Sequence, residues 1–223
     1  MTITRRRFLF DTAVASAALA VPGTLLGGAC AEAQPRPRRA APGRPRGPAP
    51  AICRLTEDNI EGPYYRPGAP WRANLADART PGTRLLVTGA VRSTDCRTAL
   101  AGAVVDVWHA SADGHYDNDG SGALPVDQFV FRGRLHTGAD GRFALHTIIP
   151  GRYLNGPQYR PSHVHVKVRA AGHAPLTTQL YFDGDPYNAV DPWVKRSLVL
   201  RLESAADRGK AAEFDFTLAR TAA

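Results

Sequence analysis

The chain has 223 residues and a formal net charge of +8, a balance that by itself would suit a protein that binds nucleic acid. Residues 1–50 hold eight arginines against Asp11 and Glu32, so they carry +6 of that charge. In residues 51–223, twenty basic side chains are interspersed with eighteen acidic ones. The composition therefore predicts a soluble globular protein of one domain and argues against a nucleic-acid binder.

Residues 1–33 have the anatomy of a twin-arginine export signal. Arginines at positions 5 to 7 precede a mostly apolar run over residues 12–26, and Ala31-Glu32-Ala33 fits a cleavage site after Ala33. The apolar run is about fifteen residues long, which is short for a membrane span, although an amino-terminal anchor stays open as an alternative. The signal predicts a periplasmic or extracellular protein that meets the membrane during export, or also afterwards if Cys30 is lipidated.

Residues 34–51 are a run of Pro, Arg, Ala and Gly with little apolar surface to bury. We therefore expect a disordered linker there and a folded domain over residues 52–223. If Cys30 leaves with the leader, Cys53 and Cys96 remain as a pair in an oxidising compartment, and a disulfide between them is the natural hypothesis. The alternative is two unpaired, buried thiols.

Short segments with apolar residues at every second position recur through the folded part, and no segment has a long 3.6-residue period. Asp140-Gly141 between two such segments favours a hairpin turn. The predicted strands span residues 84–91, 103–109, 129–137, 142–149, 163–169, 177–182, 197–203 and 213–218. This pattern predicts an all-β fold, an antiparallel β-sandwich of about eight strands with long loops and little helix.

Two histidines on the strand predicted at 163–169 give the first sign of chemistry. His163 and His165 share one face of that strand, about 6.6 Å apart, while Val164 and Val166 point to the other face. The valine face would pack in the core, and the histidine face would be free to bind a metal. Alone, such a pair is more often two surface or hydrogen-bonded histidines, so the surrounding residues decide.

Six motifs between residues 61 and 182 run in this order: Glu-Gly-Pro-Tyr-Tyr (61–65), Val-Asp-Val-Trp-His (105–109), Asp-Gly-His-Tyr (113–116), Pro-Gly-Arg-Tyr (150–153), Arg-Pro-Ser-His-Val-His (160–165) and Thr-Gln-Leu-Tyr-Phe (178–182). In these motifs and their spacing, the chain resembles the intradiol ring-cleavage dioxygenases. That family contains the protocatechuate and catechol dioxygenases, which open aromatic diols at a non-haem ferric centre. The resemblance covers most of residues 52–185.

The resemblance implies that Tyr116, Tyr153, His163 and His165 are the four protein ligands of Fe(III). Ferric iron is a hard cation that favours anionic oxygen, and its charge can deprotonate a tyrosine that would otherwise stay neutral at pH 7. Two phenolates and two neutral imidazoles would leave the site with a net charge near +1, which a bound hydroxide would neutralise.

The reaction implied by the family adds both atoms of O2 to a catechol-type diol and breaks the bond between the two hydroxyl-bearing carbons, giving a cis,cis-muconic acid. The diol would displace one tyrosinate, Tyr116 or Tyr153. Arg160 matches the family's active-site arginine, with a structural salt bridge as its alternative role. Gln179 matches a position near the O2-side pocket, and its alternative role is a strand residue satisfied by the backbone.

Four further residues of the motifs have expected roles. Tyr64 and Tyr65 would line the entrance of the site, or would only pack beside the adjacent proline. His109 is interpreted as structural, and Asp106 as a buried partner of an arginine.

The resemblance is to the catalytic sandwich, because the chain lacks the long amino-terminal helical domain with which catechol dioxygenases dimerise. The substrate and the oligomeric state therefore stay open, and an oligomer is compatible with the sequence. The alternative functions are a transthyretin-like secreted binding module and a zinc or copper enzyme of another class. The filled ligand set disfavours the first, and the two tyrosines disfavour the second.

Overall fold

A computed structural model of the chain describes residues 53–221. The expected export signal, Cys30 and the expected linker lie outside these described residues. Within them strands dominate, and the helical pieces are short 3-10 turns: η1 (Val126–Gln128), η2 (Pro186–Ala189), η3 (Arg196–Leu198) and η4 (Ala206–Arg208). No helix in this part of the chain is long and apolar enough to cross a membrane.

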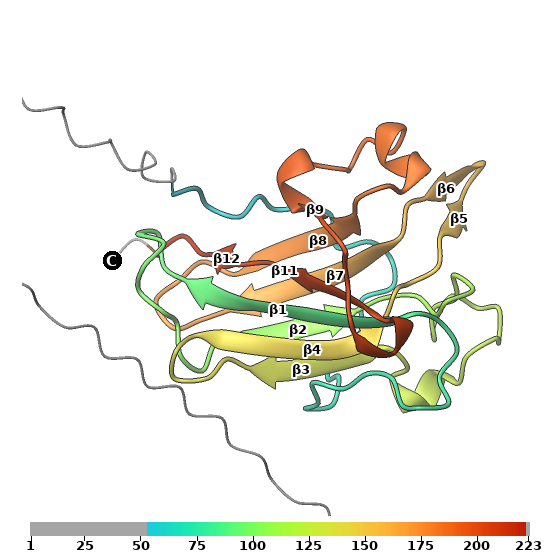
Figure 1. The fold of residues 1–223 in the computed structure, drawn as a ribbon, viewed down its shortest axis with the longest axis horizontal. Coiled ribbons are helices and arrows are strands. Elements are labelled where there is room, and N and C mark those ends of the chain that lie inside the picture. The colour runs from blue at the N-terminus through green and yellow to red at the C-terminus, as the bar shows by residue number, and fades with distance from the viewer. Residues whose placement is uncertain (1–52, 222–223) are drawn as a thin grey trace, which may run out of the picture. The chain divides into compact units, whose positions relative to one another are not determined.

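One sheet is built around β1 (Figure 1). β1 (Arg84–Arg92) pairs antiparallel with β4 (Arg142–Ile148) and parallel with two short strands near the end of the chain, β11 (Lys210–Glu213) and β12 (Phe216–Thr217). β10 (Glu203–Ser204) pairs with β11 at the edge of this sheet.

The second sheet has the strand order β3-β2-β7-β8-β9 and carries His163, His165 and Gln179. Its pairs are antiparallel apart from that of β8 with β9. The strands are β2 (Val104–Trp108), β3 (Arg132–His136), β7 (His163–Arg169), β8 (Leu176–Phe182) and β9 (Val199–Leu200).

The main core lies between these two sheets. Val164 and Val166 of β7 belong to it together with Leu85 of β1. Because successive side chains of a strand point to opposite faces, His163 and His165 lie on the other face of β7. The predicted all-β sandwich is confirmed, with some parallel pairs added by the short strands near the end of the chain.

Three predicted strands are shorter than expected. Residues 129–137 yield only β3, because Phe129 and Phe131 adopt positive φ values of 50° and 53°, which a strand does not admit. Residues 197–203 begin inside the 3-10 turn η3 and leave only β9 and the first residue of β10. The strand predicted at 213–218 is split between β11 and β12.

Two connections differ from the prediction. The turn at Asp140-Gly141 does not close a hairpin, because β3 pairs with β2 in one sheet while β4 pairs with β1 in the other. A hairpin that was not predicted, β5 (Tyr153–Asn155) and β6 (Gln158–Arg160), carries two site residues. Strands of three residues are too short to reveal an alternation in the sequence.

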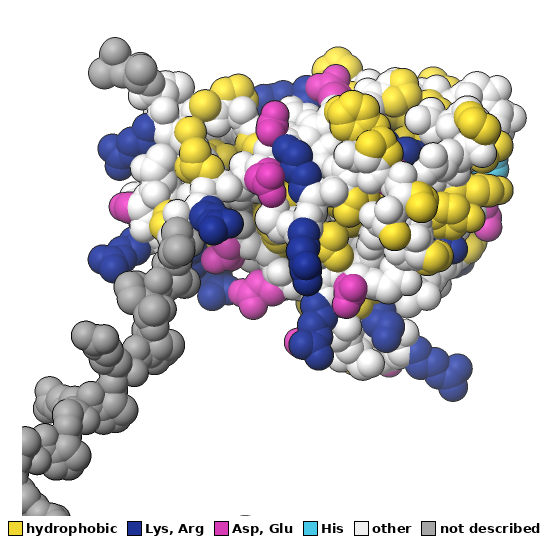
Figure 2. Space-filling model, turned by 90° about the horizontal axis from the view of Figure 1, so that it is seen from above, with side chains coloured by type: hydrophobic (Ala, Val, Ile, Leu, Met, Phe, Trp, Pro, Cys, Tyr) yellow, Lys and Arg dark blue, Asp and Glu magenta, His cyan; other side chains and the backbone are white. Residues whose placement is uncertain are grey.

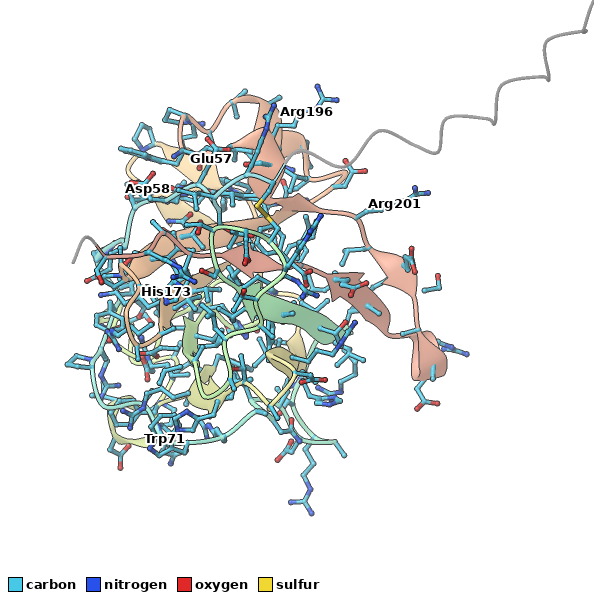
Figure 3. The ribbon with its side chains drawn as sticks, turned by 90° about the vertical axis from the view of Figure 1, so that its left-hand side faces the viewer. Glu57, Asp58, Trp71, His173, Arg196 and Arg201 are labelled. Carbon is cyan, nitrogen blue, oxygen red and sulfur yellow. A yellow bond between two sulfur atoms is a disulfide. The ribbon has the colours of Figure 1, made fainter. Side chains whose placement is uncertain are left out.

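Cys53 and Cys96 form a disulfide in the structure, with Cα atoms 5.7 Å apart (Figure 3). The bond ties the start of the described chain to the turn between β1 and β2. Nearby, the backbone amide of Thr56 donates to the carbonyl of Thr217 in β12. The segment that leads toward the site is therefore fastened to the first sheet before it crosses to the second.

Candidate metal centre and active site

His163 and His165 turn ring nitrogens toward one another on the covered face of β7. Their Nε2 atoms lie 3.1 Å apart, and the two residues are 2% and 0% exposed. The Nδ1 atom of His163 lies 2.6 Å from the carbonyl oxygen of Pro161. When the imidazole is neutral, Nδ1 donates its proton to that carbonyl, and Nε2 keeps a lone pair that faces His165.

Tyr116 and Tyr153 lie against the two histidines. The two tyrosine rings meet edge to face with centroids 5.5 Å apart. The ring of Tyr153 lies 5.6 Å from that of His163, and the ring of Tyr116 lies 6.3 Å from that of His165. The structure thus brings together all four residues that the sequence proposed as metal ligands.

Two glycines let the loops that carry the tyrosines cross at backbone contact. A Cβ atom on Gly151 would lie 2.2 Å from the carbonyl oxygen of Ala112, and one on Gly114 would lie 2.2 Å from that of Arg152. Gly114 also has a φ of +85°, which favours glycine. No larger residue fits at either crossing without moving backbone, so the crossing sets the spacing of the two tyrosines.

A buried arginine braces the loop that follows Tyr116. Arg132 of β3 is 1% exposed, and its Nε donates to Asp117 Oδ1 at 2.8 Å. The same guanidinium donates to Asn118 Oδ1 at 2.7 Å and to the carbonyl oxygen of Tyr64 at 2.6 Å. It therefore fixes the Tyr116 loop and the Tyr64 backbone together, a role for which the sequence offered no sign.

The Tyr116 hydroxyl and the two histidine nitrogens are arranged as they would be around a bound cation. The hydroxyl of Tyr116 is buried and has no hydrogen-bond partner among residues 53–221, an arrangement that costs about 1–3 kcal/mol in a dry site. Two nitrogens that bind one metal at about 2.1 Å and at right angles lie about 3 Å apart. The His163 and His165 Nε2 atoms have that separation, at 3.1 Å.

Burial sets protonation states that suit such a site. It lowers the pKa of His163 to about 3 and holds the pKa of His165 well below its usual range, and the charge of Arg160 acts in the same direction. Both imidazoles are therefore neutral at pH 7. Burial raises the pKa of Tyr116 and of Tyr153, so either phenol needs a nearby cation to become a phenolate.

The donor set is unusual for zinc or copper. Across residues 53–221, no group of three or more His, Cys, Asp or Glu side chains lies close enough to hold a metal ion. A site built on His163 and His165 therefore needs the phenolic oxygens of the tyrosines. Zinc and copper usually take histidine, cysteine or carboxylate, whereas phenolate oxygen suits a hard trivalent cation.

Arg160 and Gln179 belong to one buried hydrogen-bonded group beside the histidines. Arg160 Nη2 donates to Gln179 Oε1 at 2.9 Å, and the Tyr181 hydroxyl donates to the same oxygen at 2.7 Å. Arg160 Nε pairs with Asp191, and Gln179 Nε2 donates to the carbonyl of Ile60 at 2.8 Å. Arg160 therefore makes the salt bridge, and Gln179 the backbone contact, that were expected from the sequence as their alternative roles. These contacts also fix the guanidinium beside the site.

Sequence reasoning missed Tyr181 and Asp191. Tyr181 follows Gln179 by two residues on β8, so the alternation of the strand could have placed both on the site face. Asp191 lies between η2 and η3, in irregular backbone where no periodicity points to a partner.

Asp106 is not the partner of an arginine. It accepts a 3.1 Å hydrogen bond from the Tyr65 hydroxyl. Arg134, which lies opposite Asp106 in the β2–β3 register, donates to a backbone carbonyl instead. His109 is structural, as predicted, because its ring nitrogens contact a backbone carbonyl at 2.7 Å and a threonine hydroxyl at 2.6 Å in the interior.

Tyr64 covers the site, whereas Tyr65 packs behind it. The ring of Tyr64 stacks on Tyr116 at 4.4 Å and meets Tyr153 edge-on at 5.7 Å. Tyr65 packs on Trp108 at 4.8 Å. A cleft of about 570 Å³ opens beside Tyr64, Tyr116 and Tyr153, and its wall includes polar groups from the 113–121 loop. This cleft gives a small molecule access to the two tyrosines.

Comparisons with known proteins agree with this site. Residues 60–220 match the family model described as Dioxygenase. The chlorocatechol 1,2-dioxygenase of Rhodococcus opacus is 37% identical over 188 residues, which cover 73% of this chain and 72% of that enzyme. A 6-chlorohydroxyquinol 1,2-dioxygenase of Cupriavidus pinatubonensis is 36% identical over 181 residues, and the match spans 64% of its length.

A solved structure shows the same fold. The dioxygenase domain of a dioxygenase carbohydrate-binding protein fusion from Streptomyces sp. SirexAA-E is 41% identical, with a TM-score of 0.66, and the match covers 75% of this chain and all of that one. Fold and site together define a β-sandwich enzyme with two histidines and two tyrosines in a buried centre. The chain belongs to the intradiol ring-cleavage dioxygenases, which makes it an enzyme that acts on aromatic diols and not a binding module.

Proposed function

We propose that the protein is a non-haem Fe(III)-dependent intradiol dioxygenase. It adds O2 to a catechol-type diol between the two hydroxyl-bearing carbons and releases a cis,cis-muconic acid derivative. Tyr116, Tyr153, His163 and His165 hold the iron. The observation that carries the proposal is the buried hydroxyl of Tyr116, which has no partner among residues 53–221, beside two neutral imidazoles whose Nε2 atoms are 3.1 Å apart.

Ferric iron would supply the charge that keeps the phenols and the bound diol deprotonated, and it would draw electron density from the diol. Tyr153 is the better placed of the two tyrosines to yield its position to the diol and take up a proton. It lies on the short β5–β6 hairpin and is 8% exposed, against 2% for Tyr116. Arg160 lies opposite Tyr153 in that hairpin, so its fixed charge is available to the negative diol.

The experiment uses the purified protein loaded with iron. Tyrosinate bound to Fe(III) gives a visible charge-transfer band, so we expect a red protein that consumes O2 with catechol and yields a product cleaved between the hydroxyls. Tyr153→Phe should lose or strongly shift the band and lose turnover. Tyr187→Phe is the matched control, because Tyr187 lies in η2 and does not line the cleft beside Tyr153. A colourless, iron-free protein would defeat the proposal.

The substrate is proposed to be a catechol, with ring substituents to be found by assay. The relatives are named for chlorocatechol and 6-chlorohydroxyquinol, so a panel of catechol, chlorocatechols, hydroxyquinol and protocatechuate covers the chemistry. We further propose that the chain is exported by the twin-arginine pathway. Replacing Arg5 and Arg6 by lysine should then hold it in the cytoplasm, and unchanged export would refute this route.

A further inference from the structure

The ring of His165 is held by stacking. Trp108 lies opposite His165 in the β2–β7 register, and the two rings are 4.8 Å apart with planes only 7° from parallel. Tyr65 packs on Trp108 at 4.8 Å, and the Lys167 ammonium lies 3.9 Å from the centre of the Tyr65 ring. A series of contacts thus runs from the metal site to a charged group on the same strand.

The two histidines differ in what orients them. A metal-binding histidine usually donates its second ring nitrogen to a carbonyl or carboxylate, which fixes the plane of the ring. His163 has such a contact, at 2.6 Å from the Pro161 carbonyl. The Nδ1 atom of His165 is buried and meets no hydrogen-bonding group in the described part of the protein.

Close packing at Gly62 also restricts the ring of His165. Gly62 has a φ of +72°, and a Cβ atom there would lie 3.1 Å from His165 Cε1. The indole Nε1 of Trp108 is itself buried without a partner among residues 53–221. Trp108 therefore acts on His165 through the flat surface of its ring and not through a hydrogen bond.

We propose that Trp108 is a positioning residue for the metal: its indole fixes the plane of His165, as the Pro161 carbonyl fixes that of His163. The inference rests on the proposed function, since it assumes that His165 binds iron. Loss of the flat ring should let His165 rotate, which weakens the hold on the metal. Loss of a comparable orienting contact elsewhere costs about 10- to 100-fold in metal affinity.

The test compares Trp108→Leu with Trp108→Phe. Both remove the indole N–H, which makes no hydrogen bond, but only phenylalanine keeps a flat ring against His165. We expect iron release to a chelator to be about 10-fold faster or more in Trp108→Leu, with a shifted visible band, and within about threefold of the parent in Trp108→Phe. Phe216→Leu controls for a cavity, because Phe216 is 1% exposed in the main core.

A second pair of variants decides the question if Trp108→Leu does not fold. Gly62→Ala would press on His165 from the edge of the ring, while Gly68→Ala imposes a similar backbone strain at φ +86° with nothing within 4 Å. We expect faster iron release only in Gly62→Ala. Parent-like release in a folded Trp108→Leu, or release in Trp108→Phe as fast as in Trp108→Leu, would overturn the inference. If Trp108→Leu does not fold, parent-like release in Gly62→Ala would overturn it. Failure of the parent protein to bind iron would instead defeat the proposed function.

Discussion

At the scale of single residues, the site contains buried polar groups that a bound metal would satisfy. Tyr116 has a buried hydroxyl with no partner among the described residues, and the two histidines face each other as neutral rings. Tyr181, whose ring lies 5.8 Å from that of His163, donates its hydroxyl to Gln179 at 2.7 Å. This contrast is consistent with Tyr116 as a proposed metal ligand and Tyr181 as a residue that supports the site.

Tyr116→Phe is expected to have opposite effects with and without iron. In the metal-free protein it removes an unsatisfied buried hydroxyl, so the free energy of unfolding should rise by about 1 kcal/mol. In the iron-loaded protein it removes a ligand, so the gain from metal binding should shrink. Urea unfolding of both forms measures this. Tyr181→Phe should destabilise both forms, and a Tyr116→Phe variant that behaves like it would contradict the interpretation.

His109 makes stability depend on pH. Burial lowers its pKa to about 4, against about 6.5 in an unfolded chain. Between these values the unfolded state binds the proton and the folded state does not, so stability present above about pH 6.5 is lost as the pH falls toward 4. The loss from this one residue should reach about 3 kcal/mol. His109→Asn should flatten that part of a urea-unfolding profile, and an unchanged slope would rule His109 out.

At the scale of strands and loops, alternation in the sequence was enough to find β1, β2, β4, β7 and β8. Their inward valines and leucines follow a strict period of two. The short strands were misjudged for a physical reason: two or three paired residues carry no period. The four proposed ligand positions come from the resemblance, whereas Asp191 and the stacking of Trp108 depend on segments that meet only in the fold.

The crossing of the two tyrosine loops makes a further prediction. Gly151→Ala should destabilise the protein and weaken iron binding, because its Cβ would lie 2.2 Å from the carbonyl oxygen of Ala112. Gly138→Ala is the matched control, since its nearest neighbour is the movable side-chain oxygen of Asp140 at 3.0 Å. Thermal unfolding and iron content are the measurements. Equal behaviour of the two variants would mean that the crossing does not set the tyrosine spacing.

At the scale of the whole domain, surface charge and the disulfide bear on where the protein works. Figure 2 shows basic and acidic side chains interspersed on the visible face, as the count for residues 51–223 indicated. Figure 3 shows the disulfide at the beginning of the described chain, in keeping with the oxidising compartment that the proposed export implies.

Reduction of that disulfide should lower the stability of the domain without touching the site. Cys53 and Cys96 are 43 residues apart, and closing a loop of that length is worth about 4 kcal/mol in the chain-entropy treatment. Cys53→Ser should therefore unfold at lower urea but keep its visible band. Two alkylatable thiols in the unreduced protein would show that the bond does not form.

The two faces of β7 have a consequence for the order of assembly. Its valines are part of the main core, so the strand is fixed as soon as the sandwich forms, and the histidines on its reverse side are set in place by the same event. We therefore expect the two histidines to be in place before a metal binds, unlike the ligands of a small zinc domain, whose chain folds around its ion. Taking iron away should leave a folded sandwich that is ready to be refilled.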